Sequence, residues 1–156
     1  MTDAQVRGWE LFKGDAKCIR CHVQPVLHGV DEESLFANLG LVDSSGDTGR
    51  QQHTGLEADR GKFKTPGLRN VGLREPAGLL HDGAGDGRSL ELIMEAYNNP
   101  KQLDVNTDER MLASETLNLT EAQISDLIDF MRNALTDPRA EANAYPFDKP
   151  TLNSER

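Results

Sequence analysis

The sequence predicts a mostly α domain with long ordered loops, and three observations carry this prediction. Apolar residues recur at helical spacing in three segments, each preceded by a residue that caps helices. No segment has a convincing strand pattern. Residues 23–87 are rich in Gly, Asp and Pro and lack periodicity, and a loop that long is rare in a compact domain unless something else organises it.

The first helix is expected between residues 2 and 14. Thr2 and Gln5 have the spacing of a capping box, and Gly14 is a natural stop. The apolar face of this helix consists of Val6, Trp9 and Phe12.

Two further helices are expected in the second half of the chain. One begins after Ser89, a favourable N-cap, and ends at Asn98-Asn99-Pro100. The other has the strongest pattern, beginning at the capping-box pair Thr120 and Gln123 and ending at Asp137-Pro138. Their apolar faces consist of Leu90, Ile93, Met94 and Tyr97 in the first, and of Ile124, Leu127, Ile128, Met131 and Leu135 in the second.

Length and composition limit the classes of function. The 156 residues suit a single domain over residues 1–138 with a polar tail over 139–156. Only 37% of residues are apolar and 5% aromatic, so the core is thin, and a large apolar cofactor would thicken it. The net charge of −9 argues against binding a nucleic acid backbone or an anionic membrane surface. No apolar run approaches the roughly 20 residues of a membrane span.

Cys18, Cys21 and His22 form C-x-x-C-H, the attachment motif of a c-type haem. Two thiols three positions apart on a helical turn can form thioethers with the two vinyl groups of one porphyrin, and the adjacent imidazole can reach the iron. The other nitrogen of His22 is expected to donate to a backbone carbonyl in the loop at Pro25. The motif therefore predicts one covalently bound haem c.

Other interpretations of the two cysteines have less support. A redox-active pair would need a thioredoxin-like βαβ setting, and no strand precedes the motif. A structural zinc ion would need two more ligands. His22 and one of His28, His53 or His81 could be combined for this, but no second pair of ligands with zinc spacing follows.

Further motifs extend over residues 5–150. They are Gly8-Trp9-Glu10-Leu11-Phe12, Asn38-Leu39-Gly40, Asp47-Thr48-Gly49-Arg50, the block from Lys62 to Val71, His81-Asp82-Gly83 and Leu135-Thr136-Asp137-Pro138. Together they resemble the C-terminal, electron-transferring domain of bacterial di-haem cytochrome c peroxidases and their MauG-like relatives. The T-P-x-L-R-N block placed before H-D-G is the most specific part. The resemblance implies a cytochrome c-like, haem-binding helical domain.

The resemblance also bears on activity, because family members normally carry two such domains and this chain has one C-x-x-C-H. The half retained resembles the one that stores or relays an electron, which favours one-electron transfer with a small cytochrome, a cupredoxin or a second haem domain. One alternative is a peroxidase or MauG-like oxidase, as half of a two-haem assembly or with an open haem site of its own. Another is a haem-bearing subunit that docks onto a larger oxidoreductase.

Covalent haem attachment in bacteria takes place outside the cytoplasm, so the resemblance to c-type cytochromes implies the periplasm. The segment from Met1 to Phe12 has no apolar stretch like that of a signal peptide.

The second axial ligand of the iron is expected from the helix that follows H-D-G. In the family this ligand is Met in typical peroxidases and Tyr in the MauG-like branch, and the matching place here is Tyr97. Met111 is the main alternative. Met94, His81 and an open or water-bound site are the others. Tyr97 could equally be a core residue of its helix, because it lies on the apolar face.

Three basic residues within the motifs, Arg50, Lys64 and Arg69, are candidates for contact with haem propionates, with loop-bracing hydrogen bonds as the alternative. The segment from Asp82 to Gly87 is rich in oxygen ligands, so calcium is conceivable there, although tight glycine turns explain it as well. Residues 101–137 hold eight acids against three bases, which could face a basic redox partner or be solvated surface.

Overall fold

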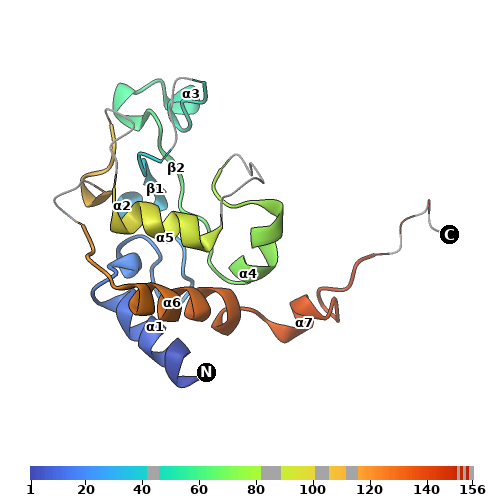
Figure 1. Ribbon diagram of the computed structural model, residues 1–156. Helices are drawn as coiled ribbons and strands as arrows, with labels where there is room; N and C mark the ends of the chain where they lie inside the picture. The colour runs from blue at the N-terminus through green and yellow to red at the C-terminus, as the bar shows by residue number, and fades with distance from the viewer. Residues whose placement is uncertain are drawn as a thin grey trace.

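The computed structural model describes residues 1–41, 46–81, 89–100, 106–111, 116–150, 152 and 154. These residues are mostly helical, which confirms the predicted fold class (Figure 1). The α-helices are α1 (Asp3–Lys13), α2 (Glu32–Leu35), α3 (Gln51–Thr54), α4 (Val71–Arg74), α5 (Leu90–Asn98), α6 (Glu121–Asp129) and α7 (Pro138–Glu141). Short 3₁₀ helices are η1 (Cys18–Arg20), η2 (Glu57–Asp59), η3 (Glu75–Ala77) and η4 (Glu109–Met111).

A small antiparallel sheet, which the sequence pattern did not predict, pairs β1 (Phe36–Ala37) with β2 (Phe63–Lys64). Phe36 is opposite Lys64, and Ala37 is opposite Phe63. Each strand has only two residues, too few to show the alternation by which strands are recognised in a sequence.

The three predicted helices are present and begin where their capping residues indicate. Both capping boxes form, Thr2 with Gln5 on α1 and Thr120 with Gln123 on α6, and the Ser89 side chain accepts from the Leu92 backbone N–H on α5. The last helix differs from the prediction in one respect, because α6 ends at Asp129 and continues as the π-helical segment η6 (Phe130–Ala134). The apolar stripe in the sequence does not show whether a turn has α-helical or π-helical hydrogen bonds, so this change was not predicted.

Hydrogen bonds between distant segments connect the described parts of the region without periodicity. The Thr65 hydroxyl donates to the Ser34 carbonyl at 2.6 Å, next to the β1–β2 pair. Asn70 joins α4 to the end of η6, because its backbone N–H donates to the Leu135 carbonyl at 2.9 Å and its side-chain carbonyl accepts from the Asp137 N–H at 2.7 Å. Through these bonds, backbone N–H and C=O groups of the loops form hydrogen bonds within the protein instead of with water.

The main packing contact in the fold is the crossing of α1 over α6, which lie side by side in Figure 1. The helices meet at Gly8, where an added Cβ would lie 2.1 Å from the Asp126 carbonyl oxygen. This close approach brings together the rings of Trp9, Phe12 and Phe130, with centroid separations of 5.3 to 5.8 Å. Phe12 and Phe130 are buried, and they form the base of the core.

The C-terminal part of the chain leads away from this core. α7 follows η6, and the described residues from 141 to 150 are all exposed. In Figure 1 this segment runs out from the helices toward the C-terminus. None of the helices in the described part of the chain combines the length and apolar character that a membrane span requires.

Replacement of Gly8 by Ala is expected to destabilise the protein by about 1–3 kcal/mol. The added methyl group would overlap backbone atoms of Asp126, which cannot rotate away, so the two helices must separate. Denaturant unfolding of the purified protein measures the change in the free energy of unfolding. Gly67→Ala is the matched control, since a Cβ at Gly67 meets nothing within 4 Å and should change stability by less than about 0.5 kcal/mol. Equal effects of the two substitutions would contradict the close crossing.

Candidate haem site

The two cysteines lie at the ends of one helical turn that follows α1. The turn is closed by hydrogen bonds to the Cys18 carbonyl from the backbone N–H groups of Cys21, at 3.2 Å, and His22, at 2.9 Å. Lys17, which precedes the turn, has a left-handed conformation with φ 55°. Both thiols are free. Burial raises the pKa of Cys18 to about 12 and also raises the pKa of Cys21, so both groups are thiols at neutral pH.

His22 is oriented by a backbone carbonyl, as expected from the sequence, and the acceptor is Leu27. The His22 Nδ1 lies 3.2 Å from the Leu27 oxygen, which also accepts from the Leu68 N–H at 3.2 Å. The carbonyl of Pro25 accepts instead from the Arg69 guanidinium at 3.0 Å. Burial lowers the pKa of His22, which favours the neutral imidazole. With its proton on Nδ1, this ring has an unprotonated Nε2 available as a ligand.

Cys18, Cys21 and His22 all border one cavity of about 330 Å³, a volume typical of small-molecule and cofactor sites. Most of its lining is apolar. The apolar lining comes from α1, from α4 and the segment before it, and from α5 and η6. It includes Phe12, Leu68, Val71, Leu90, Ile93 and Met131. The cavity therefore lies within the hydrophobic core, and several core side chains face it.

These residues fit a c-type haem. Such a group needs two thiols on one helical turn, a neutral imidazole beside them and an apolar pocket, and the described residues supply all three. The zinc interpretation gains no support, because the described residues contain no group of three or more His, Cys, Asp or Glu side chains arranged to hold a metal ion. The segment considered for calcium, Asp82 to Gly87, lies outside the described residues.

The candidates for the second axial ligand, Tyr97, Met111, Met94 and His81, all border the same cavity. Burial raises the pKa of Tyr97, and the nearby Cys18 and Cys21 add to this effect, so the phenol is neutral at pH 7. His81 stacks on Phe63 with a centroid separation of 3.6 Å.

Of the three basic residues considered for propionate contacts, the structure places Lys64 at the cavity. Arg50 instead forms an ion pair with Asp59 at 3.3 Å and lies over the Phe36 ring, and Arg69 binds the Pro25 carbonyl. Four other cations border the cavity and were not singled out in the sequence: Lys17, Arg20, Arg74 and Arg110. Lys17 and Arg20 are neighbours of the cysteines in the sequence, so their place at the cavity could have been predicted. Arg74 and Arg110 are distant in sequence and reach the cavity only through folding.

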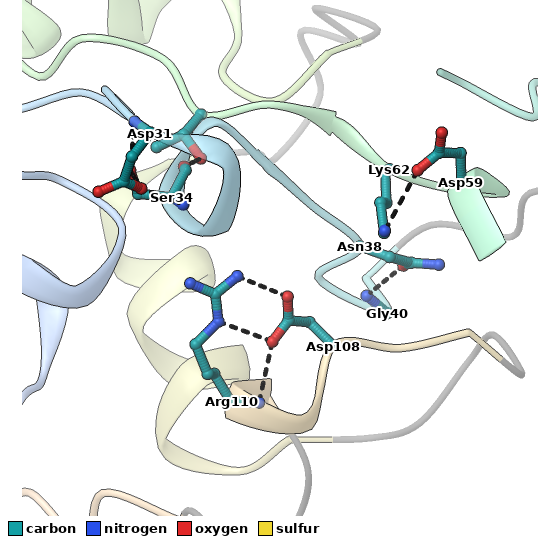
Figure 2. A network of polar contacts seen from close by, with 9 residues as sticks. Asp31, Ser34, Asn38, Gly40, Asp59, Lys62, Asp108 and Arg110 are labelled. Atoms are coloured by element: carbon teal, nitrogen blue, oxygen red, sulfur yellow. Dashed lines mark hydrogen bonds and ion pairs between the residues drawn. The ribbon is translucent and has the colours of Figure 1, made fainter. Parts of the chain in front are cut away.

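A network of polar contacts fixes the cavity wall on the side of β1 and η4 (Figure 2). The buried Asn38 accepts from the Gly40 N–H at 2.9 Å, and its carbonyl accepts from the Asp108 N–H at 2.8 Å. Asp108 in turn binds Arg110 through two side-chain contacts of 2.8 and 2.6 Å. Arg110 is therefore held in place at the cavity by a fixed carboxylate.

No protein-family model matches the chain. It is 37% identical over 83 residues to a cytochrome c551 peroxidase of Nitrosomonas europaea, covering 53% of this chain and 24% of that protein. It is 29% identical over 136 residues to the methylamine utilization protein MauG of Methylorubrum extorquens, covering 86% of this chain and 35% of that protein.

A solved structure agrees with these matches. The crystal structure of a MauG-like protein associated with microbial copper homeostasis superposes with a TM-score of 0.76 and 28% identity, over 96% of this chain and 51% of that chain. The chain thus spans about half or less of the length of these proteins. Sequence and fold together confirm the resemblance drawn from the motifs: the chain is homologous to the bacterial di-haem cytochrome c peroxidases and MauG-like proteins.

Proposed function

We propose that this chain binds one c-type haem through Cys18 and Cys21, with His22 as the proximal iron ligand, and relays single electrons. The observation that carries the proposal is the meeting of two free thiols and a neutral imidazole in one apolar cavity. The relatives support the haem part of the proposal, because they are named as a cytochrome c551 peroxidase and as MauG. The chain would correspond to the electron-transferring half of such a protein.

The chain's own residues have distinct tasks in this proposal. A bound haem supplies a reversible one-electron iron couple. The Leu27 carbonyl keeps the His22 proton on Nδ1, which leaves Nε2 free and makes it more basic. The apolar walls from α5 and η6 exclude water, and Lys64 is placed to pair with a propionate.

The expected cellular location and partners follow from covalent haem attachment and one-electron transfer. We place the protein in the periplasm, where covalent haem attachment takes place, and expect a redox protein as partner. A small cytochrome, a cupredoxin and a second haem domain are the three kinds of partner that one-electron transfer would suit.

Intact mass together with a pyridine haemochrome spectrum tests the attachment. The purified chain is expected to carry the added mass of one haem. Cys18→Ser and Cys21→Ser should each leave one thioether and one unreacted vinyl group, which moves the haemochrome band to longer wavelength, and the double variant should lose covalent haem. His53→Ala, at a histidine outside the cavity lining, is the control and should match the wild type. A wild-type mass without haem would refute the proposal.

Tyr97 is proposed as the distal iron ligand. As a ligand of ferric iron, the otherwise neutral Tyr97 would lose its proton, and a phenolate ligand would favour ferric iron and lower the reduction potential. Tyr97→Phe is therefore expected to change the optical and EPR spectra of the ferric protein and to raise its potential. The other tyrosine provides a matched control, since Tyr145 is 83% exposed in the C-terminal segment and Tyr145→Phe should have no effect. Unchanged spectra in Tyr97→Phe would exclude Tyr97, and a change in Met111→Leu would then identify the thioether.

Peroxidase activity is the second candidate function, and the names of the relatives favour it. It requires an iron position open to peroxide, either in this chain or in a second haem domain. Steady-state turnover of peroxide with a reduced cytochrome donor distinguishes the two functions. For an electron-relay domain we expect rapid, reversible reduction and no turnover by the chain alone. Sustained turnover would instead support the enzyme.

A further inference from the structure

One side chain joins the last turn of α5 to a distant segment. The Asn98 amide donates to the Leu119 carbonyl at 3.0 Å, and its side-chain oxygen accepts from the Leu119 backbone N–H at 2.8 Å. Leu119 is buried in the core and directly precedes Thr120, the N-cap of α6. Asn98 therefore pairs with both backbone groups of Leu119, as a peptide group of a neighbouring strand would, and joins the end of α5 to the beginning of α6.

This pair of hydrogen bonds lies beside the cavity wall. Tyr97, which precedes Asn98, borders the cavity, and so does Pro100, which follows two residues later. Leu117 borders the same cavity from the other segment, two residues before Leu119. Asn98 thus connects two segments that line one cavity, next to the phenol proposed as the distal ligand.

The last turn of α5 needs such a connection. The final carbonyl groups of a helix have no partners within the helix, and a helix of only nine residues is marginal without tertiary contacts. The first turn has a separate support, because the Leu90 N–H donates to the Glu75 carboxylate at 2.9 Å, and Arg132 binds this carboxylate at 2.7 and 2.6 Å. Tyr97 is roughly 10 Å further along the helix axis than Leu90, so a support at the first turn does not hold the last.

We infer that Asn98 is a positioning residue, which holds Tyr97 at the cavity by fixing the last turn of α5 to Leu119. The inference rests on the proposed function, in which Tyr97 is the distal iron ligand. Without the two hydrogen bonds, conformers with an open last turn become more populated, and in these the phenol is displaced. A ligand that is in place for only part of the time binds correspondingly more weakly.

Spectra of the ferric, haem-bearing chain test whether Asn98 acts on the ligand. Asn98→Ala and Asn98→Asp should both change the optical and EPR spectra and raise the reduction potential, in the same direction as Tyr97→Phe. The Asp variant keeps the size of the side chain and the acceptor for the Leu119 N–H, but it places an oxygen against the Leu119 carbonyl. It therefore tests the hydrogen bonds separately from the volume.

Asn70→Ala is the matched control for these spectra. It removes another hydrogen bond between an asparagine side chain and the backbone, the one from the Asp137 N–H at 2.7 Å, and Asn70 is not among the residues that line the cavity. The substitution should lower stability and leave the ferric spectra unchanged. Equal spectral changes in Asn70→Ala and Asn98→Ala would contradict a specific role of Asn98.

Cyanide binding measures how firmly Tyr97 is held, because cyanide competes with it for the ferric iron. Asn98→Ala should raise the apparent affinity for cyanide about 3- to 10-fold. The same substitution made together with Tyr97→Phe should have no further effect, since a positioning residue acts only through the residue that it positions. An effect of equal size with and without Tyr97 would overturn the inference.

Amide hydrogen exchange reports on the connection itself, without reference to the iron. Asn98→Ala should accelerate exchange in the last turn of α5 more than in its first turn, which Glu75 holds. Unchanged exchange, or unchanged spectra in both Asn98 variants while Tyr97→Phe alters them, would overturn the inference and leave the ligand assignment intact. Unchanged spectra in Tyr97→Phe would overturn both.

Discussion

The close approach of α1 to α6 at Gly8 positions the aromatic side chains on which the cavity rests. With no Cβ at Gly8, the Asp126 carbonyl can contact α1 directly, and Phe12 packs edge-on against Phe130 at 5.6 Å. The Phe12 ring also lies 6.4 Å from that of His22. A shift of either helix would therefore move the base of the cavity and the imidazole beside it. The packing of α1 against α6 therefore helps to determine the position of the His22 ring.

Backbone groups rather than side-chain networks orient the histidine. The Leu27 carbonyl receives donors from both His22 and Leu68, so one oxygen links the Cys-x-x-Cys turn to the segment that leads into α4. A carbonyl held by a second donor cannot rotate without losing that bond, which makes it a firmer support than a flexible side chain. Between α1 and α5, the described residues are held in place by backbone groups used in this way and contain little regular secondary structure.

Part of the structure could be predicted from short stretches of the sequence. The capped helices and the Cys18–His22 motif were predictable because each depends on residues within a few positions of one another. The β1–β2 pair joins residues 26 and 28 positions apart and leaves no pattern in two-residue strands. Arg74 and Arg110 reach the cavity only through folding, and Arg50, placed within a family motif, turns to Asp59 instead. Sequence spacing pointed to candidate donors for a haem, whereas the charged residues around them could be placed only from the fold.

The thin core indicated by the composition has a physical explanation in the cavity. Several residues of the core, among them Leu68, Leu90, Met94 and Met131, also line the cavity. An apolar group bound in the cavity would contact these side chains and add to the dispersion contacts that they make with one another. An apolar ligand anchored there would add contacts to helices from both halves of the chain at once. Its binding free energy would then contribute directly to folding, as it does for any ligand that binds only the native state.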